Sequence, residues 1–325
     1  MDFLQELPEQ IFRDILLRVP YKSQRKIKEL LEPAKEMMEC SQFYQDKIKF
    51  GLAKTYVCLL EEAAITIYDP VGQSSIMRSC IPTGFHLDRK SQIVCAKHKL
   101  VLLGLKLNRN YTSTILIYDL LSNTWKQGAQ IPTVTNSFAC CASPEGSIYV
   151  AGGYVGVYAD FSSPSRKAAV YKVDEDEWEL LPDMHHEISY CGAVFLEGMI
   201  YVITCTDRTQ RFDPNTRVWT TVNLSFYIPR YVYAMFGRLI AVTEKKIEQY
   251  DWEGNVWREL ELLPQKLRYI QVTVWRDQIF LCGNETTPKF YMYKPGAALS
   301  QRWISLDDPK FSVYATVKSI VTIDI

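Results

Sequence analysis

The chain has 325 residues, 47% hydrophobic and 13% aromatic, so it can bury a sizeable core. Its 37 basic residues balance 37 acidic ones, and a net charge of zero gives no general attraction for nucleic acid or for a membrane surface. The apolar runs fall short of the roughly 18 residues that a membrane span needs. No basic leader follows Met1, and the nine cysteines contain no CxxC pair. We therefore expect a soluble intracellular protein, cytoplasmic or nuclear, with reduced and buried thiols.

Residues 1–50 have a helical pattern. A first helix is predicted to begin at Pro8, where a missing amide donor costs nothing, and to stop at Pro20. Its apolar residues recur at intervals of three or four positions: Ile11, Ile15, Leu16 and Val19. A second pattern over residues 27–38 is interrupted by Pro33, which predicts two further short helices. Three short helices bury little apolar surface alone, so this segment needs a partner.

Residues 137–184 carry the clearest example of a unit that recurs along the chain. Two short apolar runs, 137–142 and 147–151, are separated by the turn sequence SPEG, which predicts a strand, a turn and a strand. Gly152 and Gly153 close the second strand, where missing side chains let neighbouring backbone approach. Two more strands are predicted at 169–173 and 178–181. Four strands in about 45 residues are typical of one blade of a β-propeller.

The same unit is found six times at a spacing of 35 to 53 residues, which predicts six blades. In four copies an aromatic residue is followed seven positions later by tryptophan: Tyr118/Trp125, Tyr171/Trp178, Phe212/Trp219 and Tyr250/Trp257. Tyr293/Trp303 is a stretched copy of the pair, and the copy at Tyr68 lacks the tryptophan. A proline follows each fourth strand: Pro82, Pro132, Pro182, Pro229, Pro264 and Pro309. The first blade lacks a strand, and residues 312–323 are predicted to supply it and so close the ring.

The blade at 137–184, with its Gly-Gly pair and Tyr171/Trp178, resembles a kelch repeat. The sequence LPEQIFRDILLRVP at residues 7–20 resembles the first helix of an F-box, and SQFY at residues 41–44 resembles the segment that ends such domains. Ala34 lies near the position where that family usually carries tryptophan. The whole chain therefore resembles plant-type F-box/kelch-repeat proteins. The expected fold is mainly β, with a six-bladed kelch β-propeller at residues 51–325 preceded by a small all-α F-box-like domain at residues 1–50.

This resemblance implies a substrate receptor of a Skp–cullin–F-box (SCF) ubiquitin ligase, which itself performs no chemistry. The helical domain would bind the Skp adaptor, and through it a cullin ligase. The propeller would bind an unidentified protein target for ubiquitination and proteasomal degradation. The residues expected to bind the adaptor are Leu7, Pro8, Ile11, Ile15, Leu16, Val19 and Pro20. The alternatives are a propeller scaffold without a ligase, in which the helices are a structural cap, and a propeller oxidoreductase similar to the copper oxidases.

The residues that carry catalytic or metal chemistry are sparse. The chain has four histidines, and adjacent His185 and His186 point apart, so one metal cannot easily bind both. The acidic turn at residues 174–177 lacks the alternating ligands and glycine of a calcium loop. Cys140 and Cys141 lie in a strand and face opposite sides, which disfavours a vicinal redox pair. No nucleotide loop or nucleophile motif is present, so we predict no metal, no cofactor and no enzyme activity.

The mouth of the predicted propeller is the candidate recognition surface. The loops after the prolines lead into the first strand of each next blade at one end of the ring, where exposed arginine and tyrosine suit protein recognition. The alternative is that these are ordinary polar loop residues. We expect Arg230 and Arg268 to pair with an acidic segment of the target. The full set predicted to bind the target is Arg89, Asn136, His185, His186, Arg230, Tyr231, Arg268 and Tyr269.

Overall fold

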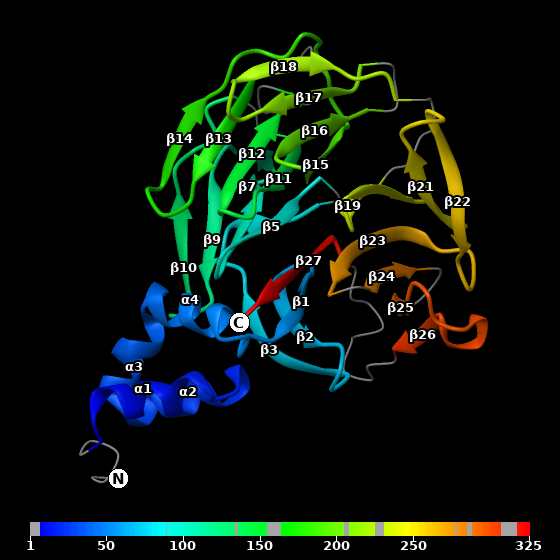
Figure 1. Cartoon of the computed structure of the whole chain (residues 1–325). Helices are drawn as coiled ribbons and strands as arrows, with labels where there is room; N and C mark the ends of the chain where they lie inside the picture. Colours follow the sequence, from blue (N-terminus) through cyan, green and yellow to red (C-terminus); the bar gives the residue numbers. More distant parts are fainter. Residues whose placement is uncertain are drawn as a thin grey trace.

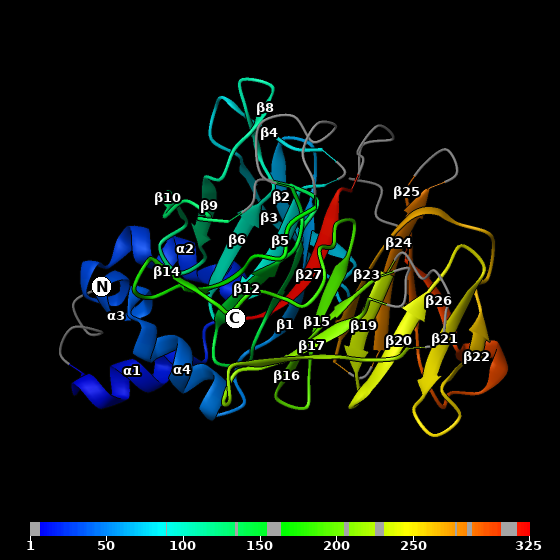
Figure 2. The same cartoon turned by 90° about the horizontal axis from the view of Figure 1, so that it is seen from above.

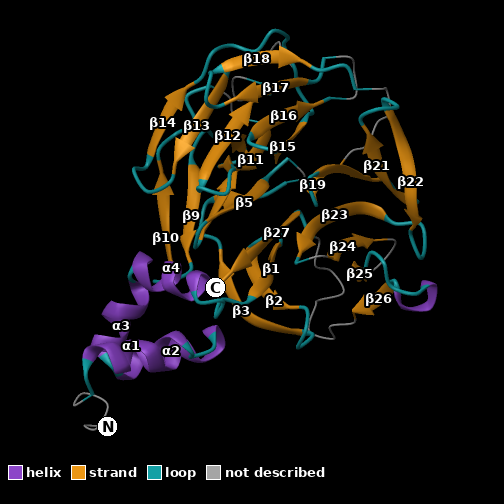
Figure 3. Ribbon diagram, viewed as in Figure 1, coloured by secondary structure: helices purple, strands orange, loops and turns teal. Residues whose placement is uncertain are grey.

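The computed structural model describes residues 7–88, 90–133, 136–154, 164–204, 208–224, 231–276, 278–284, 288–306 and 317–325. Within these ranges a helical segment near the N-terminus is followed by β-strands to the C-terminus, so the protein is mainly β (Figure 1 and Figure 3). No helix among the described residues has the length and apolar character needed to cross a membrane.

The helical segment contains four α-helices in the described residues: α1 (Glu9–Leu17), α2 (Tyr21–Leu30), α3 (Glu32–Glu39) and α4 (Ser41–Lys49). Pro8 immediately precedes α1 and Pro33 lies in the first turn of α3, as the sequence predicts. Pro20 caps the start of α2, which begins six residues before the pattern predicted at residues 27–38. The sequence pattern does not reveal the fourth helix, because its periodic apolar positions are few. Packing fixes it instead, since Phe43 joins a buried cluster with Phe12, Leu16 and Met38.

The strands form six four-stranded antiparallel sheets in the described ranges, in addition to one small three-stranded sheet. Sheet 1 contains β27 (Ser319–Asp324), β1 (Thr55–Leu60), β2 (Ala64–Asp69) and β3 (Ser74–Cys80). Sheet 2 contains β5 (Gln92–Ala96), β6 (Lys99–Leu103), β9 (Ile115–Asp119) and β10 (Thr124–Gly128). Sheet 3 contains β11 (Ala139–Ala142), β12 (Ser147–Ala151), β13 (Ala168–Lys172) and β14 (Glu177–Leu180).

The remaining three large sheets have the same order of strands. Sheet 4 contains β15 (Gly192–Leu196), β16 (Met199–Ile203), β17 (Gln210–Asp213) and β18 (Val218–Thr221). Sheet 5 contains β19 (Tyr231–Met235), β20 (Arg238–Val242), β21 (Lys246–Asp251) and β22 (Val256–Leu262). Sheet 6 contains β23 (Arg268–Trp275), β24 (Gln278–Asn284), β25 (Pro288–Tyr293) and β26 (Trp303–Leu306).

The innermost strands of these sheets meet around a common axis. In the order β27, β5, β11, β15, β19 and β23, each strand contacts the next, and β23 contacts β27 again. Figure 1 looks nearly along this axis and shows the sheets fanning outward from it. The arrangement is propeller-like, and most of the core lies between the faces of neighbouring sheets.

The C-terminal strand β27 completes sheet 1, which confirms that the tail supplies the missing strand. It pairs with β1 over six residues, from Thr55 opposite Asp324 to Leu60 opposite Ser319. One detail differs from the prediction, because β27 takes the innermost place and β3 is already the outer strand. The two ends of the sheet region are therefore held in one sheet, and β27 covers the inner edge of β1.

The repeated aromatic–tryptophan pairs are cross-strand neighbours. Tyr171 lies directly opposite Trp178 with their ring centroids 4.9 Å apart, and Tyr250 lies opposite Trp257 at 5.0 Å. The seven-residue spacing places both rings on one face of a short hairpin between the third and fourth strands. The Trp178 indole also donates a 2.9 Å hydrogen bond to the Ala129 carbonyl beyond sheet 2. Each pair therefore stabilises its own hairpin, and Trp178 joins neighbouring sheets as well.

A small three-stranded sheet projects from one end of the molecule, and no pattern in the sequence indicates it. It contains β4 (Phe85–His86), β7 (Lys106–Leu107) and β8 (Asn110–Tyr111). Strand β4 comes from the connection between sheets 1 and 2, whereas β7 and β8 lie in the connection between β6 and β9. We call this end the upper face. The lower face carries the turns at residues 97–98 and 120–123, and Figure 2 shows α1 and α4 towards that side.

Candidate interaction site

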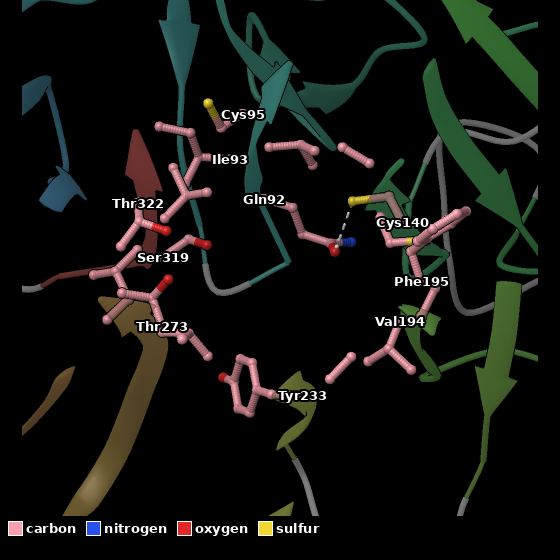
Figure 4. A pocket seen from close by; sticks show the side chains of 18 of the residues that line it. Gln92, Ile93, Cys95, Cys140, Val194, Phe195, Tyr233, Thr273, Ser319 and Thr322 are labelled. Carbon is pink, nitrogen blue, oxygen red and sulfur yellow. Dashed lines mark hydrogen bonds between the residues drawn. The ribbon is translucent and has the colours of Figure 1, made fainter. Parts of the chain in front are cut away.

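The innermost strands enclose a channel of about 1050 Å³. Tyr44 and Ile48 of α4 line its lower end, while Lys90 and Tyr190 line the upper end. Figure 4 shows Gln92, Tyr233 and Thr273 among the side chains that point into it. The lining thus mixes polar, charged and apolar groups, and all six large sheets contribute to it.

The channel contains thiols, but these are not poised for nucleophilic chemistry. The Cys140 thiol donates a 3.0 Å hydrogen bond to Oε1 of Gln92 (Figure 4). Burial raises the pKa of Cys95 and of Cys141 to about 12, so both are protonated at neutral pH. Cys140 and Cys141 pack against different core clusters, as expected for alternate facing in a strand. In the described part of the chain, no three His, Cys, Asp or Glu side chains gather as a metal site requires.

The cysteines only partly match the prediction of buried thiols. The eight that fall in the described ranges are free, and Cys58 and Cys282 are fully buried. Cys40 and Cys80, however, are exposed, because Cys40 lies between two helices and Cys80 ends the outer strand β3. The expectation of uniform burial was therefore wrong for these two.

The residues predicted to bind the target lie in different environments. Arg89 and Arg230 lie outside the described residues, while Tyr231 and Tyr269 lie in β19 and β23. Arg268 is exposed at the start of β23 on the upper face, so it stays a candidate.

Asn136 is wholly buried, so the prediction that it contacts the target was wrong. Its carbonyl oxygen accepts a 3.0 Å hydrogen bond from the Tyr154 amide, and the side-chain oxygen accepts one of 2.9 Å from the Ser137 hydroxyl. These hydrogen bonds hold Asn136 against Tyr154 and Ser137, and the local sequence did not reveal them.

His185 and His186 lie on the loop after β14, and their backbone is fixed from sheet 4. Both amides donate to Oε1 of the buried Gln210, at 2.7 and 3.3 Å. The His185 ring is exposed and lies 3.3 Å from the Thr221 hydroxyl. The pair therefore contributes to the loop surface, and each amide is held by a buried partner.

A cluster on the upper face, which the sequence did not predict, involves Lys90, Lys106, Tyr111 and Tyr190. The Lys90 ammonium lies 5.2 Å from the ring centroid of Tyr111 and 5.4 Å from that of Tyr190. The Lys106 ammonium lies 4.6 Å from the Tyr111 ring. The sequence carries one indication that these residues lie on the upper face, because Lys90 and Tyr190 each precede an innermost strand by two residues. Their pairing needs contacts between distant segments, which no local pattern encodes.

The first helix divides the predicted adaptor-binding residues into two groups. Ile11 and Ile15 are 50% and 43% exposed, and Pro8 and Pro20 are also exposed. Leu7 and Val19 are partly buried against the helical core. Leu16 is only 3% exposed, so its assignment to the adaptor surface was wrong. The periodic spacing groups Leu16 with Ile11 and Ile15 on one face of the helix. That face is wide, and the side that carries Leu16 packs against the helical core.

The helical segment is docked firmly on sheets 1 and 2. The Tyr21 side chain is 8% exposed, and its hydroxyl donates a 3.1 Å hydrogen bond to the Leu120 carbonyl. Burial raises the pKa of Tyr21, so this hydroxyl remains a donor. The buried Lys28 ammonium donates to the Leu121 carbonyl, and the Tyr44 ring lies edge-on to His98 at 5.2 Å. Helices α2 and α4 thus both contact the lower face of sheet 2.

Replacing Tyr21 with alanine should release the helical segment from the sheets. Loss of a buried aromatic side chain costs about 3–5 kcal/mol, and the Leu120 carbonyl would also lose its partner. We expect trypsin to cut residues 49–55 much faster, while the sheets keep their thermal midpoint. Y21F should lose only about 1 kcal/mol. The exposed neighbour supplies a control, K22A, which should behave as the unaltered protein. Equal protection of Y21A and K22A would show that Tyr21 is not the anchor.

Comparison with known proteins places this architecture in context. The kelch motif family model matches residues 136–185, the segment that forms sheet 3 and its flanks. One F-box/kelch-repeat protein of Arabidopsis thaliana is 27% identical over 70% of this chain and 71% of its own length. A second from the same plant is 26% identical over 62% of each chain, and kelch-like protein 23 of Mus musculus is 26% identical over 54% of this chain and 34% of its own. The solved structure of YjhT aligns with a TM-score of 0.49 at 12% identity, covering 66% of this chain and 82% of that one.

The fold and the motif define a mainly β, propeller-like protein with a kelch repeat. Its similarity to plant-type F-box/kelch-repeat proteins, predicted from residues 7–20 and from the repeats, is confirmed by these relatives.

Proposed function

We propose that the protein is the substrate-recognition subunit of an SCF-type ubiquitin ligase, acting in the cytoplasm or nucleus. Residues 1–50 form an F-box-like domain that binds the Skp adaptor and through it a cullin. Residues 51–325 form a six-bladed kelch propeller whose upper face binds the target protein. The subunit performs no chemistry, because its contribution is to raise the effective concentration of the target beside the conjugating enzyme.

The exposed isoleucines of α1 carry this proposal. Phe12, Leu16 and Leu17 fill the helical core, yet Ile11 and Ile15 remain open to solvent one helical turn apart. Helix α4 is tied to α1 by an Arg13–Asp46 hydrogen bond of 3.1 Å, and it ends near the exposed side chains of Ile48 and Phe50. Several large apolar side chains exposed on so small a segment are typical of a docking surface.

The position of the helices also suits a receptor. They contact the lower face of sheet 2, whereas the Lys90–Tyr190 cluster lies on the upper face. Docking through Tyr21 would hold the adaptor surface and the target surface at a fixed orientation. A ligase needs such a fixed geometry to present target lysines to the conjugating enzyme.

Replacing both Ile11 and Ile15 with aspartate should abolish binding to the adaptor. Two charges placed in an apolar interface would cost at least about 2 kcal/mol, or roughly a 30-fold loss of affinity. The measurement is binding of the purified full chain to a recombinant Skp adaptor.

A matched control uses exposed apolar residues of the sheets, Val71 and Leu180, which are 69% and 59% exposed. The V71D/L180D variant should bind the adaptor as well as the unaltered chain. If the adaptor bound I11D/I15D and the control variant equally, the F-box assignment would be wrong.

The second candidate is a propeller scaffold in which the helices serve only as a cap. The burial of Tyr21 and Lys28 against sheet 2 favours it, because a cap needs such contacts. The same experiment separates the two functions, since a cap predicts that even the unaltered chain fails to bind the adaptor.

A further inference from the structure

The Lys90 ammonium lies at the upper mouth of the channel between two tyrosine rings. Its distances to the ring centroids of Tyr111 and Tyr190 are 5.2 and 5.4 Å, within the range of cation–π attraction. Lys90 precedes sheet 2 and Tyr190 precedes sheet 4, so their contact passes over the start of sheet 3. The two side chains therefore partly bridge the mouth of the channel.

Asp88 fixes this arrangement without neutralising Lys90. Its carboxylate accepts a 2.8 Å hydrogen bond from the Lys90 amide and another hydrogen bond from the Tyr111 hydroxyl. The carboxylate also forms an ion pair with the Lys106 ammonium at 2.9 Å. Burial opposes ionisation, but these donors hold the pKa of Asp88 below its ordinary value. Lys106 thus balances Asp88. Among the described residues, no carboxylate lies within 4 Å of the Lys90 ammonium.

The mouth carries further positive charge. Lys90 and Lys318 line the upper part of the channel, whereas Lys49 of α4, Lys97 and Asp324 line the lower part, where Lys97 pairs with Asp174. Asp324 ends β27, whereas Lys318 immediately precedes it, so the acid lies at the lower end and Lys318 at the upper end. Arg109 is exposed at the tip of the β7–β8 hairpin on the same face. An anion that approaches from above therefore meets Lys90, Lys318 and Arg109, and none of these three has an ion-pair partner among the described residues.

Tyr190 offers apolar surface beside this charge. It is 65% exposed, and its backbone has a φ of 51°, an unusual conformation for a bulky residue. A 3.0 Å hydrogen bond from its amide to the Ser137 carbonyl and an edge-on contact with Tyr154 at 5.9 Å hold it there. A strained and exposed aromatic side chain, kept in place by its neighbours, loses little entropy when a partner binds.

We propose that Lys90, Tyr111 and Tyr190 bind an acidic segment of the target protein, with a carboxylate on the Lys90 ammonium and a neighbouring apolar side chain on Tyr190. This inference rests on the proposed function, and it places the acid-binding group at sheets 2 to 4, in addition to Arg268 of sheet 6. Charge complementarity selects the occupant, because a basic or neutral segment would gain nothing from Lys90.

The test measures fluorescence anisotropy of a labelled peptide of alternating glutamate and leucine on the purified full chain. A peptide with glutamine in place of glutamate should bind about tenfold more weakly, because the charge-assisted contact is lost. K90E and K90Q should each lower the affinity for the acidic peptide by about tenfold or more, and Y190A should lower it by about fivefold. Binding should also weaken as salt rises.

The matched control is K245E, which makes the same charge change at an exposed lysine in the β20–β21 connection of the upper face. It should change the affinity by less than about twofold. The Lys90 variants keep the backbone amide that Asp88 holds, so their thermal midpoints should match that of K245E. Equal binding of the glutamine peptide, or equal affinity of K90E and K245E, would overturn the proposal. A chain that binds the acidic peptide but no Skp adaptor would instead contradict the ligase role and leave this site standing.

Discussion

Deletion of residues 319–325 should unfold the sheet region or make it aggregate. The deletion removes β27, which pairs with β1 over six residues and forms one wall of the channel. It also removes the buried side chains of Ile320, Ile323 and Ile325. At about 1.5–3 kcal/mol each, these three side chains contribute about 5–9 kcal/mol. That loss is comparable with the whole stability of a typical domain, so the effect should far exceed that expected for seven residues.

The measurement is the thermal or urea midpoint of the truncated chain beside that of S319A/T322A. Ser319 and Thr322 belong to the same strand, but they line the channel (Figure 4), so this control keeps the pairing and the buried isoleucines. It should lose less than about 1 kcal/mol. The open inner edge of β1 in the truncated chain should also promote association. A truncated chain as soluble and as stable as S319A/T322A would show that β27 is not needed for closure.

Features that depend on local chemistry could be predicted from the sequence. The seven-residue spacing of Tyr171 and Trp178 predicted a hairpin because such a turn places both residues opposite each other. Asp119 favours the turn that follows it, because its carboxylate accepts a 2.8 Å hydrogen bond from the Leu121 amide. The missing strand of sheet 1 could be deduced because every other sheet supplied four strands from one segment.

Features that depend on distant contacts could not be predicted. Strand β4 has only two residues, and its partner β7 lies about twenty positions later, so neither carries a periodic signal. The burial of Asn136 depends on the amide of Tyr154, and the position of Lys90 depends on Tyr190, one hundred residues away. The sequence therefore predicts a recognition surface at the mouth of the ring, but it does not identify the residues that gather there.

The Gly152–Gly153 pair, which first indicated a blade, yields the second large effect. Gly153 has a φ of 88°, and a Cβ placed there would lie 2.6 Å from the Asn136 carbonyl oxygen and 2.8 Å from Cβ of Phe138. Both atoms belong to buried residues, since Asn136 is 0% and Phe138 is 1% exposed. An alanine would therefore suffer backbone strain of about 1–2 kcal/mol together with overpacking of about 1–3 kcal/mol. We expect G153A to lose about 3 kcal/mol of unfolding free energy.

Two other glycines allow the backbone strain and the overpacking to be measured separately. Gly237 has a φ of 69°, but a methyl group added there would meet no atom within 4 Å, so G237A should show the backbone strain alone, about 1 kcal/mol. Gly192 has neither a positive φ nor a close neighbour, so G192A should be neutral or slightly stabilising. Urea unfolding of the three variants gives the order directly. If G153A were no less stable than G237A, the chain would accommodate the methyl group by moving Asn136, and the close approach of the two backbones would not explain the glycine.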